Sequence, residues 1–303
     1  MYIEKVFEGK TDAWRFVVGI FILIVAIIIA QTPFAIAVIA EVGIEAMASL
    51  DEAQMLRVLD PNTSLFYLLL PFAVAFFVMF LVVNKLHDQK TVNFLTTRSR
   101  FDWQRVIFAF LVVAVLAVLS LGIEFYLNPE KYVWNYDANK FFVLLLIAVL
   151  MVPLQTTAEE LFFRGYLMQG IGLWARNRWV PLLATSLLFG VLHGSNPEVA
   201  KMGSILILVY ILTGFFLGII TLMDDGLELA IGFHAANNLV VALLVTADWT
   251  AFQTHSLFKD VAEPQLAFYL MAPPIIYAII LFVFSKKYGW TSWRNKLLGN
   301  LEM

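Results

Sequence analysis

The stretch that decides the fold runs from Lys140 to Leu173 and reads KFFVLLLIAVLMVPLQTTAEELFFRGYLMQGIGL. Its first half carries no charge after Lys140, and its second half places two acids and an arginine among apolar and aromatic side chains. A helix of about 20 mostly apolar residues is long enough to cross the hydrocarbon core of a bilayer. The stretch therefore predicts a membrane helix that carries charge.

The composition of the whole chain agrees with a membrane protein. The 303 residues are 61% hydrophobic and only 14% charged, and the mean hydropathy is +0.82. Soluble domains are about half apolar and a quarter charged. These values exclude a soluble globular enzyme, a disordered protein and a nucleic-acid-binding protein. The chain has no cysteine, which removes disulfides, thiolate nucleophiles and cysteine-ligated metals from consideration.

Seven further apolar segments are present, and none alternates as a β-barrel strand would. We therefore predict an all-α, polytopic membrane protein, a bundle of about eight transmembrane helices in a single domain over residues 1–303. Polar side chains at membrane depth fall within residues 140–246, in helices 4, 5 and 7, where we expect the functional site. The eight predicted helices are Trp14–Ala40, Ser64–Val83, Gln104–Leu127, Lys140–Leu173, Trp179–His193, Met202–Leu222, Leu227–Val245 and Leu266–Ser285.

Positive charge sorts to one side of this predicted bundle. With eight spans the two termini share a side, and most of the 20 Lys and Arg residues fall there. Cytoplasmic loops carry an excess of Lys and Arg, so we predict that both termini are cytoplasmic. The basic segment Lys85–Arg105 suits anionic lipid, although ordinary positive-inside topology is the simpler explanation. The first helix is too long for a cleaved signal peptide, so we expect an uncleaved anchor.

Three charged residues lie inside the predicted fourth helix. An ionisable side chain at membrane depth is costly and indicates function by default. Glu160 and Arg164 are four residues apart, so they share a helix face and can pair. Glu159 lies about 100° around the helix from Glu160. Because Arg164 neutralises only one carboxylate, the second is left without a partner.

Two histidines and an asparagine add to this set. His193 ends the fifth helix, and His234 lies in the seventh with Asn238 one turn further on the same face. The other histidines, His87 and His255, fall in polar loops, where we expect surface positions. Taken singly, such groups can be helix–helix contacts. Taken together, one unpaired carboxylate, two imidazoles and a carboxamide are the components of a hydrolytic site: a general base, a group that holds water, and oxyanion donors.

The three polar motifs resemble those of the CPBP family of intramembrane proteases, also called CAAX proteases or the Abi or Rce1-like family. The family pattern is Glu-Glu-x-x-x-Arg, then Phe-x-x-x-His, then His-x-x-x-Asn, on separate helices. Here the order and spacing match at Glu159 to Arg164, Phe189 to His193, and His234 to Asn238. Each motif alone is weak, whereas all three in order inside apolar helices are a specific signal. The resemblance covers about Leu146 to Val245 and implies an intramembrane endopeptidase with a catalytic core of helices 4 to 7.

The resemblance also implies a role for each motif residue. Glu159 would be the general base that activates water, and His193 would help to position that water. His234 and Asn238 would stabilise the tetrahedral oxyanion. A carboxylate in a dry pocket is a better base near neutral pH, and oxyanion donors act more strongly where water is scarce.

Glu160 and Arg164 would support this geometry by pairing. The residues alone do not choose between Glu159 and Glu160 as the base. The position of the family's first glutamate and the pairing of Glu160 with Arg164 both favour Glu159.

A metal is the main open question about cofactors. Two histidines and a glutamate suit zinc, and the family is often called a metalloprotease. The zincin string His-Glu-x-x-His is absent from the sequence. We expect no metal and no other cofactor; if zinc were bound, its ligands would be Glu159, His193 and His234.

Two other classes of function fit some of these residues. A proton-coupled transporter also needs Glu, His and Arg at membrane depth, but it would favour two related halves, which the sequence lacks. The resemblance also allows a non-catalytic scaffold or bacteriocin-immunity protein. For an endopeptidase the expected partners are a lipidated or membrane-anchored peptide or protein substrate and membrane lipids, with no nucleic acid. The short loops resemble those of a prokaryotic inner-membrane member.

Overall fold

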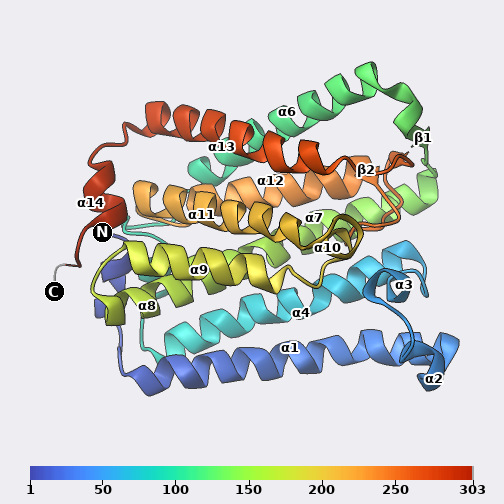
Figure 1. Cartoon of the computed structure of the whole chain (residues 1–303). Helices are drawn as coiled ribbons and strands as arrows, with labels where there is room; N and C mark the ends of the chain where they lie inside the picture. Colours follow the sequence, from blue (N-terminus) through green and yellow to red (C-terminus); the bar gives the residue numbers. More distant parts are fainter. Residues whose placement is uncertain (302–303) are drawn as a thin grey trace.

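The structure is a computed structural model that describes residues 1–301 and is mostly helical (Figure 1). The α-helices are α1 (Ala13–Val42), α2 (Ile44–Met47), α3 (Glu52–Met55), α4 (Pro61–Leu81), α5 (Thr91–Leu95), α6 (Trp103–Leu127), α7 (Ala138–Glu160), α8 (Met168–Ala175), α9 (Trp179–Leu192), α10 (Pro197–Met202), α11 (Ile207–Asp224), α12 (Glu228–Leu244), α13 (Leu266–Tyr288) and α14 (Trp293–Leu298). Short 3-10 helices are η1 (Ile3–Glu8), η3 (Pro129–Lys131) and η5 (Ser204–Leu206), and π-helices are η2 (Val82–Leu86) and η4 (Leu161–Leu167). The strands are β1 (Tyr132–Trp134), β2 (Val245–Thr246) and β3 (Phe258–Asp260).

Helices form at all eight predicted places, close to the predicted ends. Several begin at an aspartate whose side chain accepts a backbone N–H of the first turn, as at Asp60, Asp102 and Asp137. Within residues 1–301, six segments are long and apolar enough to cross a membrane: Ala13–Val42, Pro61–Leu86, Trp103–Leu127, Ala138–Ala175, Ser204–Asp224 and Leu266–Tyr288. The chain is therefore an all-α, multi-pass integral membrane protein.

The other two predicted helices, α9 and α12, are short. They have 14 and 17 residues, which is about 21 and 26 Å at 1.5 Å per residue, against a hydrocarbon core of about 30 Å. α9 packs against α8 and α11, and α12 packs against α6, α7 and α11. Neighbouring helices therefore hold both in place. The number of full crossings stays a prediction.

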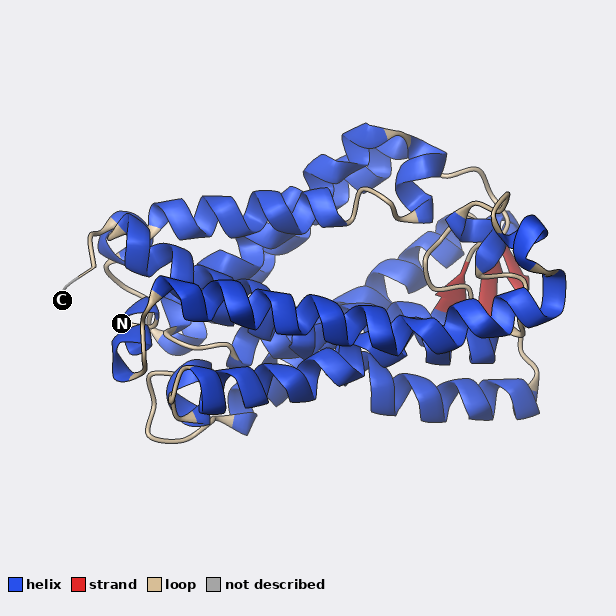
Figure 2. Cartoon of the chain, turned by 90° about the horizontal axis from the view of Figure 1, so that it is seen from below, coloured by secondary structure: helices blue, strands red, loops and turns tan. Residues whose placement is uncertain are grey.

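The described chain begins and finishes at the same end of the bundle, and the small sheet lies at the opposite end (Figures 1 and 2). Arg178 joins the two terminal segments, since its Nη2 lies 2.5 Å from Glu4 Oε1 and its Nη1 donates to the Asn295 carbonyl at 3.0 Å. The strand order is β1-β3-β2, with β1 antiparallel and β2 parallel to β3. Termini at one end agree with the prediction that they share a side of the membrane; which side stays a prediction.

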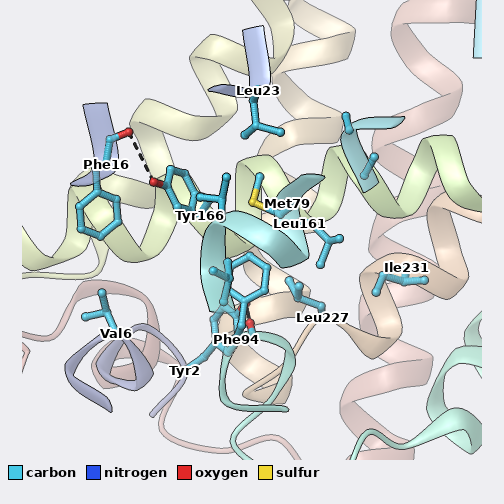
Figure 3. Packing of buried hydrophobic residues seen from close by; sticks show 14 residues of the cluster. Tyr2, Val6, Phe16, Leu23, Met79, Phe94, Leu161, Tyr166, Leu227 and Ile231 are labelled. Carbon is cyan, nitrogen blue, oxygen red and sulfur yellow. Dashed lines mark hydrogen bonds between the residues drawn. The ribbon is translucent and has the colours of Figure 1, made fainter. Parts of the chain in front are cut away.

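A hydrophobic cluster fastens the N-terminal segment to the fourth helix, and Figure 3 shows Phe94 and Leu161 within it. His87 lies at its edge and is only 4% exposed. His87 Nδ1 lies 2.9 Å from the Lys10 carbonyl oxygen, and His87 Nε2 lies 2.8 Å from Tyr166 Oη. Burial lowers the pKa of His87 below its usual value. The predicted surface position of His87 is therefore wrong, because η1 and the fourth helix cover the loop that carries it.

The second loop histidine keeps a more open position. His255 is partly exposed, and its Nε2 lies 3.1 Å from Asp60 Oδ2. This pair links the start of α4 to the loop before β3. His255 therefore fits the predicted loop position, with a local electrostatic role.

Two acids are buried where α11 passes into α12. Asp224 Oδ2 lies 3.1 Å from Arg98 Nη2, and Glu228 Oε2 lies 3.2 Å from Arg98 Nη1. Arg105 also pairs with Asp224, and Trp290 Nε1 donates to it at 3.3 Å. Two arginines of the basic segment Lys85–Arg105 thus neutralise acids of the chain itself, which leaves fewer of them to contact lipid.

Glycines allow α9 and α11 to approach closely. A Cβ built at Gly214 would lie 2.9 Å from Ser186 Cα and 3.0 Å from the Ser186 carbonyl oxygen. At Gly218 a Cβ would overlap the Leu182 side chain. Both neighbours belong to α9, so this small-residue pair serves packing within the chain.

We expect Gly214→Ala to lower the free energy of unfolding by about 1–3 kcal/mol, because backbone atoms of α9 would have to move. Gly122→Ala in α6 is the matched control, since nothing lies within 4 Å of a Cβ built there. The control should be neutral or stabilising by up to about 1 kcal/mol, as alanine is the better helix former. Thermal unfolding in detergent, followed by circular dichroism, measures both. Equal melting temperatures for the two variants would contradict the close approach.

Candidate active site

The buried charges lie where the fourth helix changes its geometry. α7 ends at Glu160, and the π-helix η4 begins at the next residue. Such wide turns are rare and occur often at functional sites. The four-residue spacing divides the polar residues into two faces, one with Gln155 and Glu159, the other with Glu160 and Arg164. Both faces point into the protein, since all four side chains are buried.

Glu160 is held by two donors on one oxygen. Arg164 Nη1 lies 3.0 Å from Glu160 Oε1, and His234 Nδ1 lies 2.8 Å from the same atom. Glu160 and Arg164 are both 0% exposed. Arg164 also donates to the Gly214 carbonyl at 3.1 Å and lies 4.5 Å from the centre of the Phe189 ring. The predicted pairing of Glu160 with Arg164 is therefore present, and it extends to His234.

Among the described residues, no arginine or lysine pairs with Glu159. Its Oε1 accepts a hydrogen bond from Gln155 Nε2. Its Oε2 has no hydrogen-bond partner within residues 1–301 and lies 3.8 Å from His234 Nε2. His234 thus lies between the two glutamates, with Nδ1 on Glu160 and Nε2 toward Glu159. One carboxylate oxygen of Glu159 is left to accept a further hydrogen bond.

His193 caps the end of α9 and faces the same cluster. Its Nδ1 lies 2.6 Å from the Phe189 carbonyl oxygen, which places the proton on Nδ1 and leaves Nε2 as an acceptor. The ring stacks on Tyr210 with 4.5 Å between centres and 24° between planes. The centre of the Phe189 ring lies 4.3 Å from the centre of the His193 ring and 6.1 Å from that of the His234 ring. The two histidines therefore lie beside the same aromatic ring.

Asn238 joins this cluster through a residue that the motifs do not contain. Its Nδ2 donates to Gln155 Oε1 at 3.1 Å, and Gln155 in turn donates to Glu159. Sequence reasoning missed Gln155, although its four-residue spacing from Glu159 was an available signal. It also missed Tyr210, for which the sequence offers no signal, because the stack joins α9 to a different helix.

The proposed zinc ligands do not assemble as a metal site. In the described part of the chain, no three His, Asp or Glu side chains gather in a way that could hold a metal ion. His234 Nδ1 is engaged by Glu160, and His193 Nδ1 by a backbone carbonyl. Both bonds leave Nε2 available, as in histidines that bind a metal through that atom, so they do not argue against zinc. We derive no chemical step through a metal. A metal-free mechanism stays a prediction.

The fold and the site define a membrane-embedded protein with the side chains of a hydrolase. Comparison with known families supports this class. The family model described as "Type II CAAX prenyl endopeptidase Rce1-like" matches residues 138–240, which contain all three motifs. Residues 138–240 thus resemble the Rce1-like family that the motifs indicate, and this family supports a protease or, more generally, a hydrolase.

One relative resembles nearly the whole chain. "Uncharacterized protein YyaK" of Bacillus subtilis (strain 168) is 28% identical over 286 residues, which cover 92% of this chain and 95% of that protein. No solved structure matches the chain. The likeness to the relative extends beyond the Rce1-like region into the first helices and the last.

Proposed function

We propose that the chain is an intramembrane endopeptidase that hydrolyses a peptide bond with water activated by Glu159. One observation carries the proposal: Glu159 Oε2 is buried, has no hydrogen-bond partner within residues 1–301, and lies 3.8 Å from His234 Nε2. A water molecule about 2.8 Å from each of these atoms could bridge them. A carboxylate and an imidazole on one water is the arrangement that general-base hydrolysis uses.

The surrounding residues supply the remaining steps. The water oxygen attacks the carbonyl carbon, and Glu159 takes the water proton. The oxyanion forms near the Asn238 amide and the His234 ring, which Glu160 holds through Nδ1 at 2.8 Å. His193 Nε2 accepts a hydrogen bond from the water. The C–N bond then breaks, and Glu159 returns its proton to the leaving amine, which gives a new carboxyl terminus and a free amine.

The substrate class follows from the location of the site and from the family description. Because the site lies within a membrane bundle, we propose a lipidated or membrane-anchored peptide or protein as substrate. The description of the matching family names a CAAX prenyl endopeptidase, so a prenylated carboxyl-terminal peptide is the first probe. We further propose a prokaryotic inner-membrane location with cytoplasmic termini.

The test is a cleavage assay with purified chain in liposomes. The probes are a farnesylated peptide that ends in a CAAX sequence and its unprenylated counterpart, both in water enriched in heavy oxygen. We expect cleavage of the farnesylated peptide, with one heavy oxygen in the new carboxyl group, detected by mass spectrometry. If the folded chain cleaves neither peptide, the proposed function is wrong.

The alternative functions predict other results. Proton uptake into sealed vesicles that disappears in Glu159→Gln, without peptide cleavage, would favour a proton-coupled transporter. A bacteriocin-immunity phenotype that survives loss of both Glu159 and His193 would favour a non-catalytic scaffold.

Asn238→Ala should lower kcat by about 100-fold, with KM changed little, because an oxyanion donor acts mainly in the transition state. The neighbouring Asn237 provides a control, since its exposed side chain donates to Asn238 Oδ1 at 3.0 Å without reaching Glu159. Asn237→Ala should lose clearly less activity. Steady-state kinetics on the same peptide measures both, and equal losses would argue against an oxyanion role for Asn238.

A further inference from the structure

We infer that Gln155 is a positioning residue that couples the general base to the oxyanion donor. This inference rests on the proposed function, and it concerns a residue outside the three motifs. Gln155 is 6% exposed and lies on α7, one turn before Glu159. Its amide bonds Glu159 of its own helix and Asn238 of α12. It therefore connects the two groups that must act on opposite sides of the reacting carbonyl.

The direction of each hydrogen bond in this connection is fixed by chemistry. An ionised carboxylate only accepts hydrogen bonds, so Gln155 must turn its Nε2 toward Glu159. Its Oε1 then faces Asn238 and accepts from Nδ2 at 3.1 Å. Asn238 Oδ1 is left to accept from Asn237 Nδ2, at 3.0 Å. All three bonds run the same way, from the exposed Asn237 to the buried Glu159.

This orientation selects the reactive oxygen of Glu159. A carboxylate has two equivalent oxygens, and a free side chain would exchange them by rotation. The Gln155 donor holds Oε1, which leaves Oε2 toward His234 Nε2 at 3.8 Å. The base is therefore set toward the place where we propose that water binds.

The same amide orients Asn238. The Asn238 Nδ2 atom carries two N–H groups, and Gln155 takes one of them. The amide plane is then fixed, so the second N–H has a single direction, which we assign to the oxyanion. Donors that are held in place before the reaction are the ones that lower its barrier most.

Gln155 is not needed to join α7 to α12. Apolar side chains already pack the two helices together, among them Leu144, Ala148 and Val152 of α7 against Leu239 and Leu243 of α12. An apolar residue of similar size would fill the same space without a buried amide. A role in placing Glu159 and Asn238 explains the amide, and a role in packing does not.

The decisive variant is Gln155→Met, which keeps the volume and removes both hydrogen bonds. We expect kcat to fall by about 100-fold, because a small misplacement of reacting groups lowers the rate by about this factor. KM should change by less than about threefold. The matched control is Thr156→Val, the next residue, which is fully buried and bonds only backbone carbonyls, Val152 at 3.1 Å and Pro153 at 3.4 Å. The control should keep kcat within about threefold of the unmodified chain.

A double-mutant comparison separates positioning from a general structural effect. In an Asn238→Ala background, Gln155→Met should lower kcat by a clearly smaller factor than it does alone, because one of the two side chains that Gln155 bonds is already gone. Thermal unfolding shows which variants are folded. If Gln155→Met does not fold, Gln155→Glu replaces it; this variant keeps the shape and the acceptor for Asn238 but sets a second carboxylate against Glu159, so kcat should again fall.

Glu159→Ala is assayed in parallel and distinguishes the two proposals. If Glu159→Ala still cleaves the peptide, the proposed function itself fails. If Glu159→Ala is inactive while a folded Gln155→Met or Gln155→Glu keeps kcat within about threefold, only the inference about Gln155 is overturned. Full additivity of Gln155→Met with Asn238→Ala would also overturn it.

Discussion

Replacing Glu159 with glutamine is expected to reduce peptide-bond cleavage strongly while the chain stays folded. Glutamine has the same shape and can still bond Gln155, but it cannot take a proton from water. Loss of a general base lowers rates by 10²–10⁴-fold in typical enzymes, and we expect about 1,000-fold here. The measurement is kcat on the farnesylated peptide, with thermal unfolding as the check on folding.

The control for this prediction is Glu124→Gln, the same change near the end of α6. Glu124 is partly exposed and pairs with Lys131 at 3.3 Å, at the far end of α6 from the Arg105 cluster. Its loss should leave cleavage unaffected. An active Glu159→Gln beside an inactive but folded Glu160→Gln would assign the base to Glu160 instead. Activity in both glutamate variants would remove glutamate-activated water from the mechanism.

Arg164→Met should give the largest loss of stability, about 3–5 kcal/mol in the free energy of unfolding. Removing one partner of a buried ion pair leaves the other charge uncompensated. Glu160 would then keep only His234 as a donor, and the Gly214 carbonyl would lose its bond from Arg164 at 3.1 Å. Thermal unfolding in detergent measures the effect.

A second substitution tests the cause. Glu160→Gln in the Arg164→Met background removes the stranded charge and should recover part of the lost stability, as replacement of whole buried pairs often does. Arg57→Met is the surface control, because Arg57 is half exposed and lies 4.0 Å from Asp248. Exposed pairs contribute at most about 1 kcal/mol. If Arg164→Met and Arg57→Met have the same melting temperature, the Glu160–Arg164 pair does not stabilise the bundle.

The parts of the fold that the sequence predicts well are those set by hydrophobicity alone. Runs of about 20 apolar residues have few alternatives to a membrane helix, and helices such as α6 and α13 begin within a residue of the predicted place. Contacts among the buried charges were also predictable, because charges inside apolar segments are rare and must find one another. Glu160 and Arg164 do so at the expected four-residue spacing. The catalytic roles and the limits of the core at residues 140–246 stay predictions.

What the sequence could not predict depends on contacts between distant segments. Gln155 is uncharged and stands beside two threonines, so only its four-residue spacing from Glu159 marks it until Asn238 is placed next to it. Asp224 and Glu228 occupy helix ends, where charge is ordinary, and only the fold covers them. His87 lies in a polar loop whose burial requires the N-terminal segment to fold over it. The π-helix η4 interrupts a pattern that reads as continuous α-helix.

The shortness of α9 has a consequence for the surrounding lipid. Several apolar side chains of α9 face outward, among them Leu183, Leu187 and Val191, so acyl chains lie against a helix of 14 residues. The bilayer must become thinner beside α9 so that its hydrocarbon thickness matches this short helix. Such thinning costs fractions of a kcal/mol per Å of difference between the two lengths. Short-tailed lipids meet this side of the protein at lower cost than long-tailed ones. The membrane's composition would then act on the site through α9, because His193 stands at the end of this helix.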